Sequence, residues 1–214
     1  MNIRFFALAA GLSAVAAFGQ AVDGPFQIRY ASNLAIGDSV INFTNSGASS
    51  TVAGIPGPQN GDVCANVYAY SPDEQLVSCC SCNVTPNALN SLSAKNDLAS
   101  NTLTPIIPSA LVVKDLATAG GTNCTASTAA TAGTAPAVFV QGLLAWGTTI
   151  HALPVTAGSP AGTYFGTENA FSNATLSAAE LSRMTQLCSF IRANGSGYGI
   201  CKSCKVGGLG ASSK

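Results

Sequence analysis

Apolar and polar residues alternate along several short stretches of the chain, and this alternation predicts β-strands. In the clearest stretch, 63–70, every second residue is apolar and would lie on one face of a strand. The turn sequence at 71–74 would let residues 75–80 pair back as a hairpin. Further strands are predicted at 26–30, 39–43, 91–94, 98–103 and 110–116, with one or two core strands within 138–153. Short strands at this spacing favour a sandwich or a barrel.

The pattern changes near the C-terminus, where apolar residues recur at helical spacing. Ser177 and Glu180 have the capping-box spacing that begins a helix, and Asn194-Gly195 is a typical helix end. The apolar stripe between them consists of Leu181, Met184, Leu187, Cys188 and Ile191. A stripe of this kind docks on a neighbouring element. We therefore expect one amphipathic helix over 177–194 that packs against the sheet.

The first 21 residues have the three parts of a secretory signal peptide. Arg4 gives a positive start, residues 5–18 form an apolar run, and 19–21 fit a small-residue cleavage site. The apolar run is shorter than the roughly 20 residues that cross a bilayer, so no transmembrane anchor is expected after cleavage. We predict export, with residues 22–214 as a single β-rich domain. Within it we expect a flexible low-complexity loop at 118–136, the helix at 177–194 and a cysteine-containing tail at 195–214.

The charge balance argues against nucleic acid as a partner. The chain has nine basic and nine acidic residues, and one of the basic residues, Arg4, lies in the signal segment. Phosphate binding requires clustered lysines and arginines. The only local excess is Lys202, Lys205 and Lys214 near the C-terminus, which we interpret as a solvated tail.

All eight cysteines lie after the signal segment, and three of them fall within four residues. An even number of cysteines in an exported chain predicts disulfides. The candidates are Cys64, Cys79, Cys80, Cys82, Cys124, Cys188, Cys201 and Cys204. We expect the cluster at 79–82 to be linked to Cys64 and to the C-terminal segment, which would clamp the helix onto the sheet.

The same cysteines leave two other kinds of site open. The two clusters could supply four thiolates to one zinc ion, and Cys201-x-x-Cys204 has the spacing of a thiol–disulfide exchange site. An oxidising compartment favours disulfides over both kinds of site. A thiol–disulfide exchange site would also lie at the start of a helix, whereas Cys201 and Cys204 come after one. Haem attachment would require a histidine where Lys205 stands. We therefore predict no metal and no cofactor.

No catalytic motif is present in the sequence. His151 is the only histidine and lies in an apolar run, and the chain has no G-x-S-x-G turn. Paired acids for glycoside hydrolysis would have to include Asp73, Glu74 or Glu168, which do not form a recognisable pair. Asp73 and Glu74 also lack the loop pattern of a calcium site. We therefore assign no catalytic residue and favour a protein that is not an enzyme.

Two features resemble known proteins. The segment 37–47, GDSVINFTNSG, resembles strands of immunoglobulin-like modules in bacterial surface proteins. The segments C-C-S-C and N-G-S-G-Y-G-I-C-K-S-C make the whole chain similar to exported, cysteine-rich bacterial proteins of unassigned function. This resemblance implies no activity and no site residues.

The sequence thus predicts a mainly β, disulfide-stabilised, β-sandwich-like domain with one C-terminal amphipathic helix. We expect it to be secreted, periplasmic or on the cell surface, as a structural or interaction module whose partners are further copies of itself or other extracellular components. One alternative is a module that binds a carbohydrate or a small ligand, with Tyr68, Tyr70 and Trp146 as candidate stacking residues. The second alternative is a secreted hydrolase.

Overall fold

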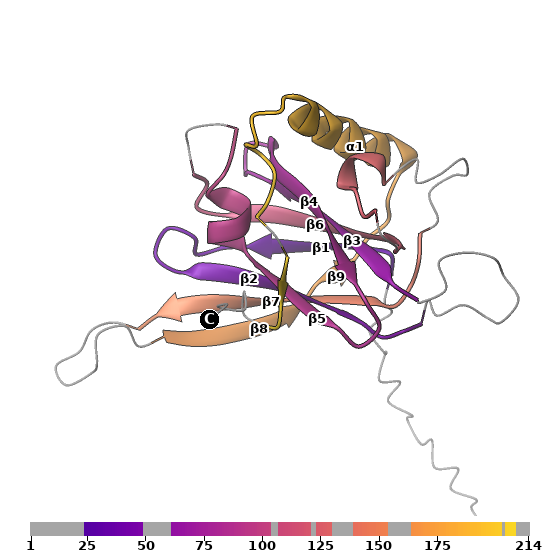
Figure 1. Cartoon of the computed structure of the whole chain (residues 1–214). Coiled ribbons are helices and arrows are strands. Elements are labelled where there is room, and N and C mark those ends of the chain that lie inside the picture. The colour runs from indigo at the N-terminus through magenta and orange to yellow at the C-terminus, as the bar shows by residue number, and fades with distance from the viewer. Residues whose placement is uncertain are drawn as a thin grey trace, which may run out of the picture.

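The chain folds into two stacked antiparallel β-sheets with a helix against the outside of one of them (Figure 1). The computed structural model describes residues 24–48, 61–103, 107–120, 123–129, 139–153, 164–202 and 204–208. The predicted signal peptide lies outside these residues, as do 121–122 and 130–136 of the predicted loop. The described part confirms the prediction of a mainly β, sandwich-like domain with one C-terminal helix.

The described strands form two five-stranded sheets, sheet A with the order β4-β3-β6-β1-β9 and sheet B with the order β10-β5-β2-β7-β8. Sheet A contains β1 Phe26–Ala31, β3 Val63–Tyr70, β4 Leu76–Val84, β6 Leu111–Ala119 and β9 Ser172–Asn173. Sheet B contains β2 Asp38–Asn45, β5 Leu89–Ser93, β7 Leu143–Ala152, β8 Tyr164–Ala170 and β10 Lys205–Val206. The helical elements are the π-helical turn η1 Ala94–Ala99, the 3-10 turn η2 Ala126–Thr128 and the helix α1 Ala178–Ala193.

The strand β3 shows how the sequence builds both layers of the core. One set of its alternate residues joins the core between the sheets, and these are Val63, Ala65, Val67 and Ala69. The opposite face carries Tyr68 and Tyr70, which pack in a second apolar cluster with residues of α1 and η2. Because both faces are covered, all eight residues of β3 are buried. The predicted strand and its predicted faces are both confirmed.

The helix α1 begins and ends where the sequence predicts. The Ser177 hydroxyl accepts a hydrogen bond from the Glu180 backbone N–H, and Gly195 takes the positive φ that ends the helix. The Glu180 carboxylate pairs with Lys114 Nζ of β6 at 2.5 Å. The inward face of the helix buries Met184, Thr185, Cys188 and Ile191. The helix therefore docks on sheet A through the predicted stripe.

One predicted strand is wrong, several strands are longer than predicted, and β8 was not predicted. Residues 98–103 do not form a strand, because Ala94–Ala99 winds into η1. The Ser93 side chain accepts from the Asn96 backbone N–H, and the Asp97 carboxylate accepts from the Ser93 backbone N–H. Such local side-chain bonds favour a turn over a strand. The strands β4 and β6 extend to Val84 and Ala119, respectively.

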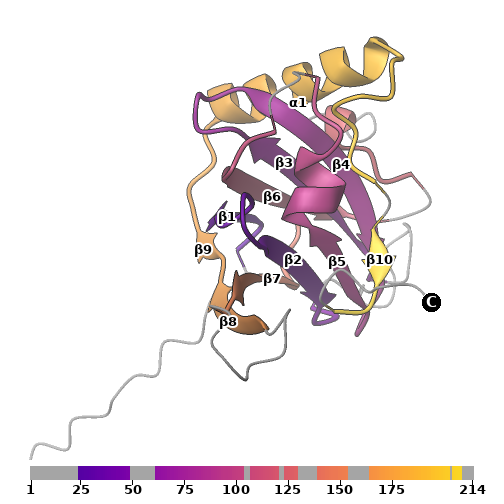
Figure 2. The same cartoon turned by 90° about the vertical axis from the view of Figure 1, so that its left-hand side faces the viewer.

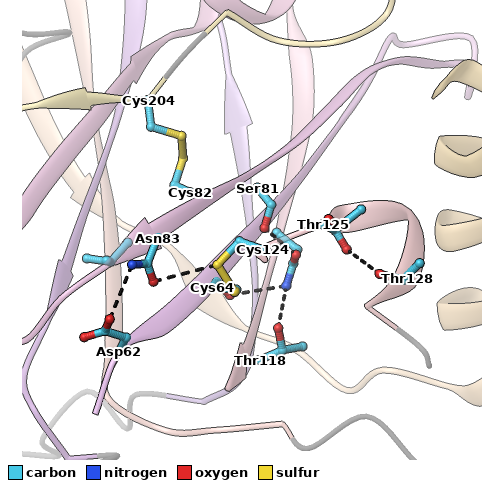
Figure 3. Close-up of a disulfide and its surroundings, with 12 residues drawn as sticks. Asp62, Cys64, Ser81, Cys82, Asn83, Thr118, Cys124, Thr125, Thr128 and Cys204 are labelled. Carbon is cyan, nitrogen blue, oxygen red and sulfur yellow. Dashed lines mark hydrogen bonds between the residues drawn. A yellow bond between two sulfur atoms is a disulfide. The ribbon is translucent and has the colours of Figure 1, made fainter. Parts of the chain in front are cut away.

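Four disulfides connect the eight cysteines, and none of these cysteines is free. Three bridges join β4 to the C-terminal part of the chain, namely Cys79–Cys188, Cys80–Cys201 and Cys82–Cys204. The fourth, Cys64–Cys124, joins β3 to the segment before η2; Figure 3 shows this bridge and Cys82–Cys204 beside β4. The predicted link from the cluster to the C-terminal segment is therefore present, and Cys79–Cys188 adds a direct bridge to the helix that was not predicted.

The predicted link between Cys64 and the cluster is wrong, for a geometric reason. Cys64 lies opposite Asn83 in the β3–β4 register, on the helix side of sheet A. Cys80 and Cys82 point to the other side, into the core between the sheets. Cys79 shares the face of Cys64 but lies four residues from Asn83, about 13 Å along the strand. Cys64 instead reaches Cys124.

The disulfide-bonded tail also covers one side of the sandwich. The backbone N–H of Cys79 donates to Gly199 O at 2.9 Å, so the tail runs along the outer edge of β4. The strand β10 then pairs with the outer edge of β5 in sheet B. Figure 2 shows β4 and β10 on one side of the molecule and β8 and β9 on the other. The tail therefore covers one pair of sheet edges, and the opposite pair ends in β8 and β9.

Candidate functional site

A groove of about 690 Å³ lies on the side of the molecule away from the tail, between β1 and the strands β7 and β8. It forms because sheet B extends past the end of sheet A, where β9 has only two residues. All seven residues of β8 are exposed as a result. The groove is lined by Ile28, Arg29, Tyr30, Ser32, Thr149, His151, Thr167, Asn169, Ala170, Ser172 and Ala174.

Polar residues of β1 point inward here, toward β7. The side chain of Gln27 donates to Leu143 O at 2.7 Å and accepts from the Ala145 backbone N–H at 3.3 Å. The apolar residues of β1, starting with Phe26, face the helix side of sheet A. The alternation predicted a strand here correctly. The polar face of β1 nevertheless turns toward sheet B rather than to solvent, because the apolar face of β1 packs toward the helix side of sheet A.

Arg29 is the central polar residue of the groove. Its Nη1 donates to Gly147 O at 2.7 Å and to Asn169 O at 2.6 Å, and its Nη2 donates to Thr149 Oγ1 at 3.0 Å. The residue is only 8% exposed. A Cβ atom at Gly147 would overlap the guanidinium, so a glycine in the middle of β7 makes room for this side chain. Arg29 therefore lies flat against β7 and links the two sheets.

No acid among the described residues forms an ion pair with the guanidinium of Arg29. Burial lowers the pKa of Arg29 from its usual value, but a guanidinium stays protonated in proteins. Of the described residues that line the groove, none is acidic, and the ion pair found in the described part of the chain is the one between Lys114 and Glu180. The groove thus carries a buried positive charge.

An aromatic pair lies at the edge of the groove, where His151 lines it and Phe165 of β8 stacks on His151. The rings of His151 and Phe165 stack with centroids 4.6 Å apart and an interplanar angle of 13°. His151 Nε2 lies 3.1 Å from Thr167 Oγ1. Tyr30 lines the groove from β1 and is 61% exposed. The groove therefore combines flat ring faces with hydroxyl and amide groups.

The structure places the predicted stacking residues elsewhere. Tyr68 is fully buried, and its hydroxyl donates to Ala126 O at 2.6 Å. Tyr70 is also buried, beneath Lys114. Burial raises the pKa of Tyr70 to about 12, and that of Tyr68 still further. Trp146 lies between the groove-side residues Ala145 and Gly147 in β7, so its side chain is on the opposite face of sheet B. None of the three can stack on a ligand in the groove.

The residues considered for catalysis do not come together. His151 lies in the groove, whereas Asp73 and Glu74 lie in the turn between β3 and β4. Glu168 alternates with the groove-lining residues of β8, and its carboxylate accepts from Thr148 Oγ1 at 3.2 Å. Among the described residues, no carboxylate bonds to His151.

The sulfur atoms of Cys80, Cys82 and Cys204 lie within 4.8 Å of one another. This spacing would suit a metal ion if the three were thiolates. Each of them is held in a disulfide, however. The cluster therefore offers covalent cross-links rather than thiolate ligands.

Sequence reasoning missed Arg29, Tyr30 and Phe165 as site residues. One available signal was Gly147, since a glycine inside a strand often marks the close approach of another group. The other was the pair of long polar side chains at alternate positions of β1, Gln27 and Arg29. Neither signal identifies the partner strand, so the groove follows only from the fold.

No protein-family model, curated protein or solved structure matches the chain. The described helices include none with the length and apolar character needed to cross a membrane.

Proposed function

We propose that the chain is an exported, non-enzymatic interaction module that binds a carbohydrate in the groove beside β8. Export is supported by the signal-like first 21 residues and by the disulfides, which persist in oxidising compartments. The module would act in the periplasm, on the cell surface or in the surrounding medium. Its partner would be an extracellular or surface component that carries sugar.

The observation that carries this proposal is the exposed aromatic pair next to polar side chains. Sugar rings present apolar C–H faces, which pack on flat aromatic rings, and hydroxyls, which need donors and acceptors around them. The His151–Phe165 stack and Tyr30 supply rings. Thr167 and Asn169 supply polar groups on the same surface. A groove that is open along one side suits a segment of a longer chain.

Binding is favoured over hydrolysis because the described residues of the groove form no catalytic arrangement. Acyl or glycosyl transfer by a histidine or an acid requires a second ionisable group within reach of the reacting atoms. In the described residues, His151 contacts a threonine and a phenylalanine. These contacts fix the orientation of the imidazole ring but supply no ionisable partner for proton transfer.

The test is retention of the purified protein on immobilised polysaccharides, followed by calorimetry with soluble oligosaccharides. We expect Tyr30→Ala combined with Phe165→Ala to weaken binding by about tenfold or more, because exposed rings are the anchors of such sites. The matched control is Tyr198→Ala with Phe190→Ala, two aromatic residues of similar exposure on the tail side. Equal binding by both double variants, or no retention on any polysaccharide, would refute the proposal. Self-assembly of the protein without a ligand would instead support a structural role.

A further inference from the structure

We infer that the groove selects an acidic sugar, one whose carboxylate binds Arg29 and Thr149 while its ring lies on the aromatic pair. This inference rests on the proposed function and names the ligand class for the same groove. It is carried by a charge that the fold buries and does not neutralise.

The hydrogen bonds of Arg29 leave part of its guanidinium unused. A guanidinium has five N–H donors, and the side chain makes three hydrogen bonds to Gly147, Asn169 and Thr149. The Nε–H has no partner, but it is buried against Gly147 of β7 and out of a ligand's reach. The remaining donor is the second N–H of Nη2, beside Thr149. Two of the three acceptors are backbone carbonyls, which hold the charge in place without cancelling it. Arg29 therefore offers an anion one N–H, that of Nη2.

Thr149 adds a second donor at the same place. Its hydroxyl accepts from Arg29 Nη2, so its own proton must point elsewhere. Its other described contact is with the Ser39 hydroxyl at 3.4 Å, a long distance for a bond between hydroxyls. A carboxylate is a stronger acceptor than a hydroxyl. One carboxylate could accept from Arg29 and from Thr149 together, through its two oxygens.

Asp38 and Glu168, two acids on the strands of sheet B, do not compete for this charge. Asp38 accepts from the backbone N–H of Ser39 and of Lys95 and from the Ser93 hydroxyl, at the end of β2. Glu168 occupies a position of β8 that alternates with the groove-lining residues. Among the described residues that line the groove, a ligand anion would therefore meet donors and no carboxylate.

The number of charges favours a carboxylate over a phosphate or a sulfate. Proteins that recognise phosphate groups gather several arginines or lysines, and the lining residues include one arginine and one histidine. A single guanidinium suits a group with a single negative charge. The neighbouring rings then favour a sugar acid over a simple carboxylate, because an unsubstituted carboxylate would leave them uncovered.

The test compares an oligosaccharide of uronic acids with its methyl ester, which has the same skeleton without the charge. Calorimetry at pH 7 should show that the acid binds about tenfold more tightly, the size expected of one charge-assisted hydrogen-bonded contact. Equal affinity for acid and ester would overturn the inference and leave the proposed function standing. Failure of both to bind, with a neutral oligosaccharide also failing, would overturn the inference and the proposed function together.

The matched variants are Thr149→Val and Thr148→Val. They are adjacent in β7, and Thr148 faces the opposite side of the sheet, toward Glu168. Because Arg29 also links the two sheets, its own substitution would confuse binding with folding. We expect Thr149→Val to abolish the preference for the acid over the ester, and Thr148→Val to keep it. Full preference in a folded Thr149→Val variant, checked by thermal unfolding, would refute the inferred contact.

Discussion

The two sides of the sandwich are held together in different ways. On the tail side, Cys80–Cys201 and Cys82–Cys204 fix the chain along β4, and β10 covers the edge of β5. On the groove side, β8 is exposed along its whole length, and the described residues there contain no disulfide. The sheets are linked there by hydrogen bonds of Gln27 and Arg29 to β7.

This difference separates stability from recognition. A disulfide stabilises a fold mainly by lowering the conformational entropy of the unfolded chain. It can therefore stabilise the whole domain from a position far from the binding surface. A binding surface, by contrast, needs exposed donors and rings. Concentrating covalent links on the tail side leaves the groove side free to present polar groups. The comparison therefore predicts that substitutions on the tail side alter stability, and that substitutions in the groove alter binding.

The largest effect should come from removing the link between the helix and the sheet. We expect Cys79→Ala with Cys188→Ala to lower the free energy of unfolding by about 3–5 kcal/mol, because this bridge closes the loop between α1 and Cys201 while Cys80–Cys201 stays intact. Both cysteines are fully buried, so a cavity adds to the loss. Urea unfolding measures the change.

The control for that variant is Cys64→Ala with Cys124→Ala, which opens a separation of 60 residues but leaves the helix tethered. Hydrogen exchange should show early loss of protection in α1 only when Cys79 and Cys188 are replaced. Early exchange in α1 in both variants would mean that the helix does not depend on its own bridge.

On the groove side, Gly147→Ala should be the most damaging single change. The added Cβ would displace the Arg29 guanidinium and break its three hydrogen bonds. We expect a loss of about 2–4 kcal/mol, from overpacking and from lost bonds to a charged group. Hydrogen exchange should increase in β7 and β8 and stay unchanged in β4.

A matched control is Gly166→Ala on β8, where a Cβ would meet the Thr148 methyl group at 3.1 Å. That contact can relax by a small side-chain movement, so we expect less than about 1 kcal/mol. If the two variants were equally stable, Arg29 would not be the link between the sheets on this side.

Between the two sides lies Asp115, a buried acid in the core. It faces the same side of β6 as Val113 and Ala117, and neither of its carboxyl oxygens has a hydrogen-bond partner. Burial raises the pKa of Asp115 well above its usual value. The backbone N–H of Leu116, which lies near the carboxyl without the geometry of a hydrogen bond, opposes this shift only in part. The folded state therefore favours the protonated carboxyl.

The sign of the pH dependence follows from that shift. A group whose pKa is raised on folding stabilises the fold below its unfolded pKa, about 4 for an aspartate, and loses that contribution as the pH rises. We therefore compare the free energy of unfolding of the natural protein with that of Asp115→Asn. From about pH 4 to pH 7 the natural protein should lose stability relative to this variant. Urea titrations at several pH values measure this difference. A flat difference would mean that Asp115 is ionised in the fold.

Replacement of Asp115 by an apolar residue tests the same burial at one pH. Asp115→Val should raise the free energy of unfolding at pH 7 by about 1–3 kcal/mol, because it removes an unpaired buried polar group. Neither sheet edge should be affected. Destabilisation by this variant would point to a polar partner for Asp115 that the fold requires.

Local signals predicted the tail side of the molecule well. The helix α1 was predicted within one residue at each end because its cap, its stripe and its terminal glycine are all local in sequence. The strand β3 was predicted with its bounds and faces because its alternation is regular. The inward position of Cys188 was predicted from its place on the stripe, although its pairing with Cys79 was not.

The groove could not be predicted in this way because its parts are distant in sequence. Arg29 reaches residues of β7 about 120 positions away, and nothing in β1 indicates which strand it faces. Thr149 and Thr167 have the polarity of solvent-facing strand residues. Their position in a groove depends on how far sheet B extends past sheet A. The pairing of Cys64 failed for the same reason, since it depends on which face of the sheet each cysteine occupies.

The smallest effect should come from the helix cap on the tail side. In Ser177→Ala the Glu180 backbone N–H loses its acceptor at 3.1 Å, and caps of this type contribute about 1 kcal/mol. Because Cys79–Cys188 tethers the helix beyond its first two turns, the loss should stay local. Hydrogen exchange should therefore increase at 178–181 and remain unchanged around Cys188. Ser189→Ala, an exposed change within the same helix, should leave the exchange of the first turn unaltered. If the Ser177 variant instead loosened the whole helix, the cap and not the disulfide would hold α1 on the sheet, and the contrast between a covalently fixed side and an open side would no longer hold.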